Sequence, residues 1–492
     1  MLTLRTVRIV TTGAILLSIL LAGCSLNKSP SIPPLSPIES LSPTSSASSP
    51  TSEINPDDLP SYTFEVHLDY DANQLTVQQK IVYKNISDVQ IPNFLLAVEP
   101  NLIAGVFKLN HLRVGDQDLI DYTLNGQELG FQLPVPLQPR QGLVIQLDYD
   151  LTLPEVDQGD PNEVRPKIFG VTDRQKNLVD WYPMLVPFSP QAGWQLSPPW
   201  YFGENLVYPL ANFDLSLQFA DSQNVPVVAA SAAGTVVENG IHFHLDRARD
   251  FVFSMSRQLK VISADVDGVK ISSYYYSTDG NAALAVLEAT IQAVRTYSAL
   301  FGPYPHQSLA AVHADFNDGM EYDGLYFLSD SFYNLYDGTP NNYLVMVAAH
   351  ETSHQWWFGK VGSDQANSPW LDETLATYSE ELFYEKNYPD SVKWWWSTRV
   401  DFYTPQGKID GSVNSYDGFD SYTNAVYRRG AHFMADLRTE IGDTIFFAFL
   451  TDYAETMAGK IATPSDFFRI LRQHTQANLA SLLASYFNNT SY

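Results

Sequence analysis

Residues 347–359 read VAAHETSHQWWFG, and this stretch predicts a buried helix that carries a metal site. Apolar residues flank the central HETSH on both sides, as they do in a helix packed inside a domain. Side chains four positions apart lie on one face of a helix, so the imidazoles of His350 and His354 can bind one metal ion. Glu351 projects beside them, close enough to hold a water molecule at the metal. The motif also fits two surface histidines without a metal, so the assignment depends on a third ligand.

Glu373 is the expected third ligand, separated from His354 by eighteen residues and on the next predicted helix. Two histidines and one glutamate leave the fourth position of a zinc ion open for water, which is typical of a catalytic site. The competing pattern HExxHxxGxxH does not fit, because Trp357 and Lys360 stand where it needs glycine and a third histidine. Glu380 lies two turns beyond Glu373 on the same face, either as a hydrogen-bond partner of a ligand histidine or as a solvated carboxylate.

Four segments resemble the gluzincin aminopeptidases, the family of aminopeptidase N. Residues 350–359 (HETSHQWWFG) and 370–380 (WLDETLATYSE) resemble the family pattern HExxHxWFG followed by WLNEGxAxYxE. Residues 319–322 (GMEY) resemble its GAMEN exopeptidase motif, and residues 427–430 (YRRG) resemble YxKG, which carries its catalytic tyrosine. The resemblance runs from residue 60 to about residue 490. It implies a multidomain chain: an antiparallel all-β domain followed by an α-rich, thermolysin-like zinc-peptidase domain (α+β), in a short bacterial lipoprotein form.

The resemblance also implies an activity. We expect a zinc-dependent aminopeptidase that removes N-terminal residues from peptides by zinc-activated water attack. One Zn²⁺ per chain would be bound by His350, His354 and Glu373. Glu351 would act as the general base, and Tyr427 would stabilise the oxyanion.

Substrate binding is assigned to Glu321, with Gly319 and Met320 beside it. The α-amine of a peptide has a pKa of about 7.7–8.0 and is largely protonated at neutral pH, so a carboxylate at this position can hold it. The alternative is that Glu321 is a solvated loop residue between the turns Asp318-Gly319 and Asp323-Gly324.

The chain also departs from the family motifs. Asp318 stands where GAMEN begins with glycine, and Tyr322 replaces its asparagine; Thr374 and Arg429 replace a glycine and a lysine in the two later motifs. Because the first two changes lie in the segment that would recognise the substrate's end, a zinc endopeptidase or other hydrolase stays an alternative. A non-catalytic peptide-binding surface lipoprotein is a second alternative, although such a protein needs neither the three ligands nor Glu351.

Alternating apolar residues predict the β domain over residues 60–262. Tyr62, Phe64, Val66 and Leu68 alternate with polar residues, and the same period of two recurs in residues 143–153, 213–219 and 251–255.

The period changes near residue 280, and residues 263–492 are predicted to form the catalytic domain. Helices are expected at 282–301, 340–359, 369–386, 391–404, 424–440, 443–455, 464–475 and 478–488, with a short strand at 309–313.

The N-terminal sequence predicts that the protein is exported from the cytoplasm. Residues 1–23 form an expected lipoprotein signal peptide, with Arg5 and Arg8 before a short apolar run and a segment, Leu21-Ala22-Gly23-Cys24, that resembles a lipobox. Cys24 is then lipidated, and the Ser/Pro-rich residues 24–59 form a disordered tether. We expect an extracytoplasmic protein that is lipid-anchored to a bacterial membrane. A plain signal peptide with an incidental cysteine is the alternative.

The amino-acid composition limits the classes of molecule that the protein can be expected to bind. The formal net charge is −26, which argues against nucleic acid, because neutralising phosphates requires lysine and arginine. Cys24 is the single cysteine, so no intramolecular disulfide can form. The expected partners are therefore peptide substrates and, through lipidated Cys24, a membrane.

Overall fold

A computed structural model describes residues 58–156 and 167–492. The predicted signal peptide, Cys24 and nearly all of the tether lie outside the described residues. None of the helices in these two ranges is both long and apolar enough to cross a membrane.

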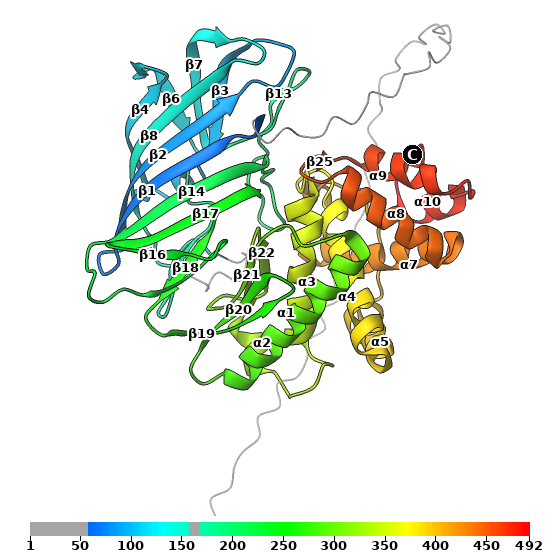
Figure 1. The fold of residues 1–492 in the computed structure, drawn as a ribbon. Coiled ribbons are helices and arrows are strands. Elements are labelled where there is room, and N and C mark those ends of the chain that lie inside the picture. Colours follow the sequence, from blue (N-terminus) through cyan, green and yellow to red (C-terminus); the bar gives the residue numbers. More distant parts are fainter. Residues whose placement is uncertain (1–57, 157–166) are drawn as a thin grey trace, which may run out of the picture. The chain divides into compact units, whose positions relative to one another are not determined.

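An eight-stranded sheet forms the body of the N-terminal domain (Figure 1). Its strand order is β16-β17-β14-β1-β2-β8-β4-β5. The strands are β1 (Ser61–Asp69), β2 (Gln74–Lys84), β4 (Phe107–Val114), β5 (Gln117–Asp118), β8 (Gly142–Thr152), β14 (Ala211–Phe219), β16 (Thr235–Val237) and β17 (Gly240–Ala248). In β1, Tyr62, Phe64, Val66 and Leu68 are buried while their neighbours are more exposed, so the expected period of two is confirmed.

Smaller sheets complete this domain. One has the order β11-β3-β7-β6, another β15-β18-β10-β9, and β12 pairs with β13. The strands are β3 (Ile91–Ala97), β6 (Tyr122–Asn125), β7 (Glu128–Leu137), β9 (Gly170–Val171), β10 (Lys176–Leu178), β11 (Met184–Leu185), β12 (Phe188–Ser189), β13 (Gly193–Trp194), β15 (Val227–Ala230) and β18 (Phe253–Ser256), with the short helix η2 (Glu99–Leu102) after β3.

One strand pair differs from the expected antiparallel arrangement. β1 and β14 run parallel, with Ser61 opposite Asn212 and Leu68 opposite Phe219. Hairpin neighbours are antiparallel by necessity, but β14 returns to β1 after a long connection, which allows either direction. The domain is therefore all-β, as expected, but not wholly antiparallel.

The second domain, predicted to be catalytic, begins with a five-stranded sheet of order β19-β20-β21-β23-β22. Its strands are β19 (Leu259–Val266), β20 (Val269–Tyr276), β21 (Ser308–Ala314), β22 (Gly319–Tyr322) and β23 (Leu325–Ser329). The expected boundary after residue 262 falls inside β19. Because β19 pairs with β20 from Leu259 onward, the whole strand belongs to this second sheet. β22 is an edge strand, antiparallel to β23.

The first three α-helices of this domain contact the sheet (Figure 1), and helices also make up most of the rest of the domain. They are α1 (Gly280–Phe301), α2 (Asp330–Asn334), α3 (Tyr343–His354), η3 (Gln355–Lys360), α4 (Trp370–Asn387), η4 (Pro389–Ser391), α5 (Val392–Trp395), η5 (Trp396–Val400), η6 (Asp401–Tyr403), η7 (Val413–Ser415), α6 (Phe419–Thr423), η8 (Asn424–Arg429), α7 (Gly430–Ile441), α8 (Asp443–Thr456), α9 (Pro464–His474) and α10 (Ala480–Tyr486). The short strands β24 (Gly362–Ser363) and β25 (Ile461–Ala462) pair in parallel. Each helix expected from the sequence is present, and several are interrupted by π-helical or 3₁₀ turns.

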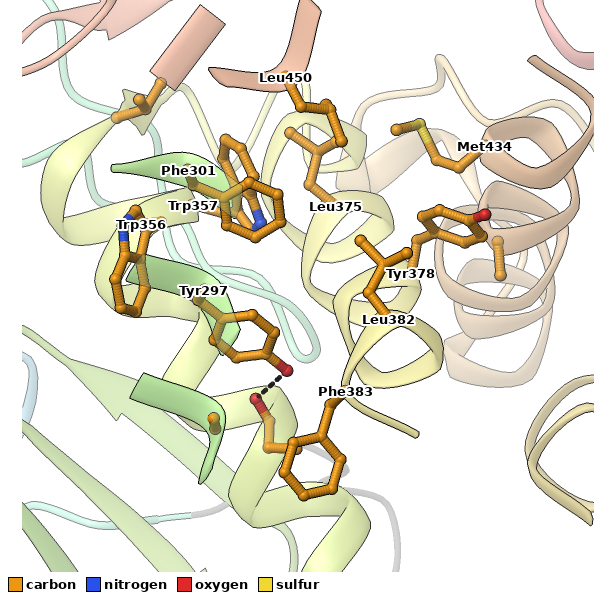
Figure 2. Close-up of a cluster of buried hydrophobic side chains, with 14 of the residues drawn as sticks. Tyr297, Phe301, Trp356, Trp357, Leu375, Tyr378, Leu382, Phe383, Met434 and Leu450 are labelled. Atoms are coloured by element: carbon orange, nitrogen blue, oxygen red, sulfur yellow. Dashed lines mark hydrogen bonds between the residues drawn. The ribbon is translucent and has the colours of Figure 1, made fainter. Parts of the chain in front are cut away.

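The metal-site helix α3 is held by its neighbours α1 and α4. Figure 2 shows Tyr297 and Phe301 of α1 in the same apolar cluster as Trp357, and the rings of Phe301 and Trp357 lie 4.6 Å apart. The Tyr297 hydroxyl lies 3.0 Å from the backbone carbonyls of both Ala349 on α3 and Ser379 on α4, which share its single hydrogen. This one side chain therefore links the two helices that carry the predicted ligands.

Arg249 joins the β domain to the second domain. Its buried guanidinium donates to the carbonyls of Gly359 (3.0 Å), Lys460 (2.8 Å) and Tyr208 (3.0 Å). Its backbone N–H donates to Asp323 at 2.8 Å, directly after β22. The end of the metal-site helix and the edge strand are thus fixed by the same residue of the β domain.

Candidate active site

His350, His354 and Glu373 come together as the sequence predicts. Their ligand atoms lie within 4.8 Å of one another, and all three side chains are buried. The Nε2 atoms of the two imidazoles are 3.1 Å apart. The Oε2 atom of Glu373 lies 3.3 Å from His350 Nε2 and 3.7 Å from His354 Nε2.

This cluster fits a metal ion. Glu373 Oε2 is buried and makes no hydrogen bond within residues 58–156 and 167–492. This oxygen faces the Nε2 atoms of both imidazoles, and a cation between the three groups would neutralise the buried carboxylate. Two imidazole nitrogens and one carboxylate oxygen are a donor set that zinc uses in catalytic sites.

Carboxylates hold the far side of each imidazole. Glu380 Oε1 lies 2.8 Å from His350 Nδ1, and Asp372 Oδ1 lies 2.6 Å from His354 Nδ1. Each carboxylate orients its ring so that Nε2 faces the metal position. Glu380 is fully buried, so it is the hydrogen-bond partner and not the solvated carboxylate. Sequence reasoning did not assign Asp372, although its place directly before Glu373 was a usable signal.

The cluster attracts positive charge. Burial alone would lower the pKa of His350, but Glu373 and Glu380 raise it to about 10. Burial likewise opposes ionisation of Glu373, but His350 and His354 bring its pKa below the ordinary value. Burial raises the pKa of Glu351 to about 7, although the two histidines act against it.

The edge strand β22 passes directly over Glu351. A Cβ atom at Gly319 would lie 2.2 Å from Glu351 Oε1 and 2.8 Å from Val347 Cγ1, so only glycine fits without a shift. The other oxygen, Glu351 Oε2, is buried and has no hydrogen-bond partner among the described residues. The carboxylate is therefore placed between the strand and the metal cluster with one oxygen available for proton transfer.

Tyr427 lies in the π-helical turn η8, and its ring stacks on that of His350 with centroids 6.1 Å apart. Burial raises the pKa of its hydroxyl, so the group stays a proton donor beside Glu373. Thr374 anchors this turn, because its hydroxyl donates to the Val426 carbonyl at 2.5 Å. Gly430 makes room for Thr374, since a Cβ there would lie 2.2 Å from its Oγ1.

Glu321 is buried and is not a solvated loop residue. Its Oε1 accepts a hydrogen bond from Gln365 at 3.3 Å and lies 4.0 Å from His354 Nδ1. Burial raises its pKa well above the ordinary value, and the charge of Glu204 raises it further. Glu204 comes from the β domain and carries no motif, so sequence reasoning could not have found it.

Most of the predicted site residues line one cavity with a volume of 260 Å³. It is lined by Gly319, Met320, Glu321, His350, Glu351, Glu373 and Tyr427, among others. His354 and Glu380 do not line the cavity. His354 belongs to the metal cluster, and Glu380 bonds to the far side of the His350 ring.

Comparison with known proteins agrees with this geometry. Residues 283–486 match the model of the peptidase family M1 domain. The chain contains an M1 peptidase domain. This M1 domain includes the metal cluster, Glu351 and Tyr427, and its presence confirms the family resemblance seen in the motifs.

Curated relatives of the M1 domain are aminopeptidases by name. Aminopeptidase M1-A of Oryza sativa subsp. japonica is 27% identical over 242 residues, covering 46% of this chain and 27% of the relative. Endoplasmic reticulum aminopeptidase 1 of Homo sapiens is 30% identical over 181 residues, covering 34% of this chain and 19% of the relative. The match thus spans about a quarter of the length of these relatives or less.

Solved structures show the same fold over most of the chain. The M1 zinc metallopeptidase from Deinococcus radiodurans has a TM-score of 0.64 at 18% identity, covering 88% of this chain and 95% of that one. A further match, with a TM-score of 0.64, is a two-domain M1 zinc metallopeptidase bound to L-tryptophan, also at 18% identity and with the same two coverages. The M1 domain and the β domain before it therefore form a known two-domain fold.

Proposed function

We propose that this protein is a zinc-dependent aminopeptidase. The observation that carries the proposal is the buried cluster of His350, His354 and Glu373 in a cavity that also contains Glu351 and Glu321. The M1 domain and the aminopeptidase names of its relatives support the same activity.

His350, His354 and Glu373 would hold the zinc ion. When bound, zinc polarises the scissile carbonyl and lowers the pKa of water. Glu380 and Asp372 would keep both imidazoles in the tautomer that presents Nε2 to the metal.

Glu351 and Tyr427 would then carry out the proton chemistry. Glu351 takes a proton from the attacking water and later passes it to the leaving amine. Tyr427 stays protonated because burial raises its pKa, so its hydroxyl can donate to the oxyanion that develops on the scissile carbonyl.

Glu321 would set the position of the cut. Its carboxylate is buried beside Glu204, and two acidic groups out of water favour a bound ammonium. A substrate whose α-amine lies at Glu321 places its first peptide bond near the metal cluster. The enzyme would therefore release one residue at a time from the N-terminus.

The test compares matched substrates on the purified protein. A free peptide and its N-acetylated form should differ strongly in kcat/KM, because the acetyl group leaves Glu321 buried and unpaired. A zinc chelator should abolish hydrolysis, and Glu351→Gln should abolish it while zinc stays bound. Equal kcat/KM for both peptides would favour the endopeptidase alternative. A zinc-loaded protein that binds peptides without cleaving them would favour the binding lipoprotein.

We also propose that the protein is extracytoplasmic and lipid-anchored to a bacterial membrane through Cys24. The support is the sequence Leu21-Ala22-Gly23-Cys24 after a short apolar run, together with the Ser/Pro-rich segment that follows.

A further inference from the structure

The substrate cavity is lined by side chains of both charges. Glu204, Asp318 and Glu321 are among its acidic residues, and Glu321 lies 4.0 Å from His354. Arg399 and Arg428 are its cationic residues. Arg399 lies near His350, because both side chains bond to Glu380, and Arg428 directly follows Tyr427, whose ring stacks on His350.

The two arginines differ in their partners. Arg399 is neutralised, because its Nε and Nη2 atoms donate to both oxygens of Glu380 at 2.9–3.2 Å. Arg428 donates from Nη1 only to neutral oxygens, those of Thr423 (3.2 Å) and Asn424 (2.9 Å). Within the described ranges it pairs with no carboxylate, and its Nε is buried without a hydrogen-bond partner.

The guanidinium of Arg428 is also held in place. Its Cζ atom lies 3.6 Å from the ring centre of Tyr403. Burial lowers the pKa of Arg428, and the neighbouring charge of Arg399 lowers it further. The charge of Asp420 offsets part of this effect, but no carboxylate among the described residues forms an ion pair with the half-buried guanidinium, so the group is suited to an anionic ligand. The planar guanidinium matches the two oxygens of a carboxylate.

We propose that Arg428 binds the C-terminal carboxylate of a short peptide whose α-amine lies at Glu321. The proposal rests on the proposed aminopeptidase function and names its substrate class. An extended chain spans roughly 3.3–3.6 Å per residue, so a dipeptide covers about 7 Å and a tripeptide about 10 Å. A cavity of 260 Å³ with both Glu321 and Arg428 in its lining is suited to such substrates.

Arg429 provides a matched control. It is the next residue in the chain, but its Cζ atom lies 4.7 Å from the ring centre of Tyr486 and its Nη2 donates to the Ser485 carbonyl at 3.1 Å. It does not line the cavity. Arg429→Gln therefore removes the same charge from the same segment without touching the proposed carboxylate site.

The experiment uses Ala-Ala-Ala and its C-terminal amide with the zinc-loaded full chain. The wild type and Arg429→Gln should prefer the free acid by about 10- to 100-fold in kcat/KM, the scale of one charge-assisted contact. Arg428→Gln should reduce this preference to about one. Arg428→Lys keeps the positive charge but loses the planar guanidinium, so it should retain part of the preference for the free acid.

The outcomes separate this proposal from the proposed function. Equal kcat/KM for acid and amide in the wild type, or a preference that survives in Arg428→Gln, would overturn the carboxylate site while leaving the aminopeptidase intact. Calorimetry measures the binding of the same two peptides, and it tests the carboxylate site even if the protein has no peptidase activity. A protein that cleaves neither peptide but binds the acid more tightly supports Arg428 and rejects the peptidase.

A carboxylate could also come from an acidic side chain. Ala-Ala-Glu-amide and Ala-Ala-Gln-amide distinguish this source, because both lack a free C-terminus. A strong preference for the glutamate peptide without any preference for free Ala-Ala-Ala would overturn the assignment to the C-terminus. The wild-type measurements decide this without any variant, so they hold even if Arg428→Gln fails to fold.

Discussion

Adding a single methyl group at Gly319 should abolish the proposed peptidase activity without preventing zinc binding. In the structure a Cβ atom at this position would lie 2.2 Å from Glu351 Oε1 and 2.8 Å from Val347 Cγ1. Ordinary contact begins at 3.4 Å, so the carboxylate or the strand must shift by roughly 1 Å. Neither Gly319 nor Val347 is one of the three metal ligands.

A displacement of about 1 Å in a catalytic group can cost about 100-fold in rate. We therefore expect kcat of Gly319→Ala to fall about 100-fold, with zinc content near one ion per chain. Steady-state kinetics on a free peptide and metal analysis of the same preparation measure the two quantities. Gly418→Ala is the matched control, because no atom lies within 4 Å of a Cβ at Gly418.

Two results would refute this reasoning. A Gly319→Ala enzyme with wild-type kcat would show that Glu351 tolerates the shift or is not the base. A variant that loses its zinc would show that β22 supports the metal cluster itself, in which case the loss of activity says nothing about the base.

Three further predictions concern other residues. Asp372→Asn should weaken zinc binding about 10- to 100-fold, because His354 loses its anionic partner; competition with a chelator measures this, and unchanged affinity would contradict it. Tyr427→Phe should lower kcat by about 100- to 1,000-fold with zinc retained, the scale of one oxyanion donor; near-wild-type kcat would exclude that role. Cys24→Ser should block lipidation, which intact-mass analysis of the membrane fraction tests; a wild-type mature chain without lipid would refute the anchor.

Local sequence was enough to predict the metal cluster and most helices. The i, i+4 spacing of His350 and His354 is a property of the helix itself, so it needs no knowledge of the rest of the fold. Glu373 follows in the next helix, and α1 and α4 appear within two residues of their expected ends. The β domain was likewise visible in its period of two, because each strand has one buried face.

Contacts between distant segments could be learned only from the tertiary structure. The parallel pairing of β1 with β14 depends on where a long connection returns, which no local pattern encodes. Glu204 reaches the cavity from the β domain. Position 319 requires glycine because strand β22 passes so close to Glu351 of helix α3 that a Cβ atom would clash with it. The sequence shows Arg428 as one of two adjacent arginines. Only the fold, by turning one toward the cavity and the other toward Tyr486, distinguishes them.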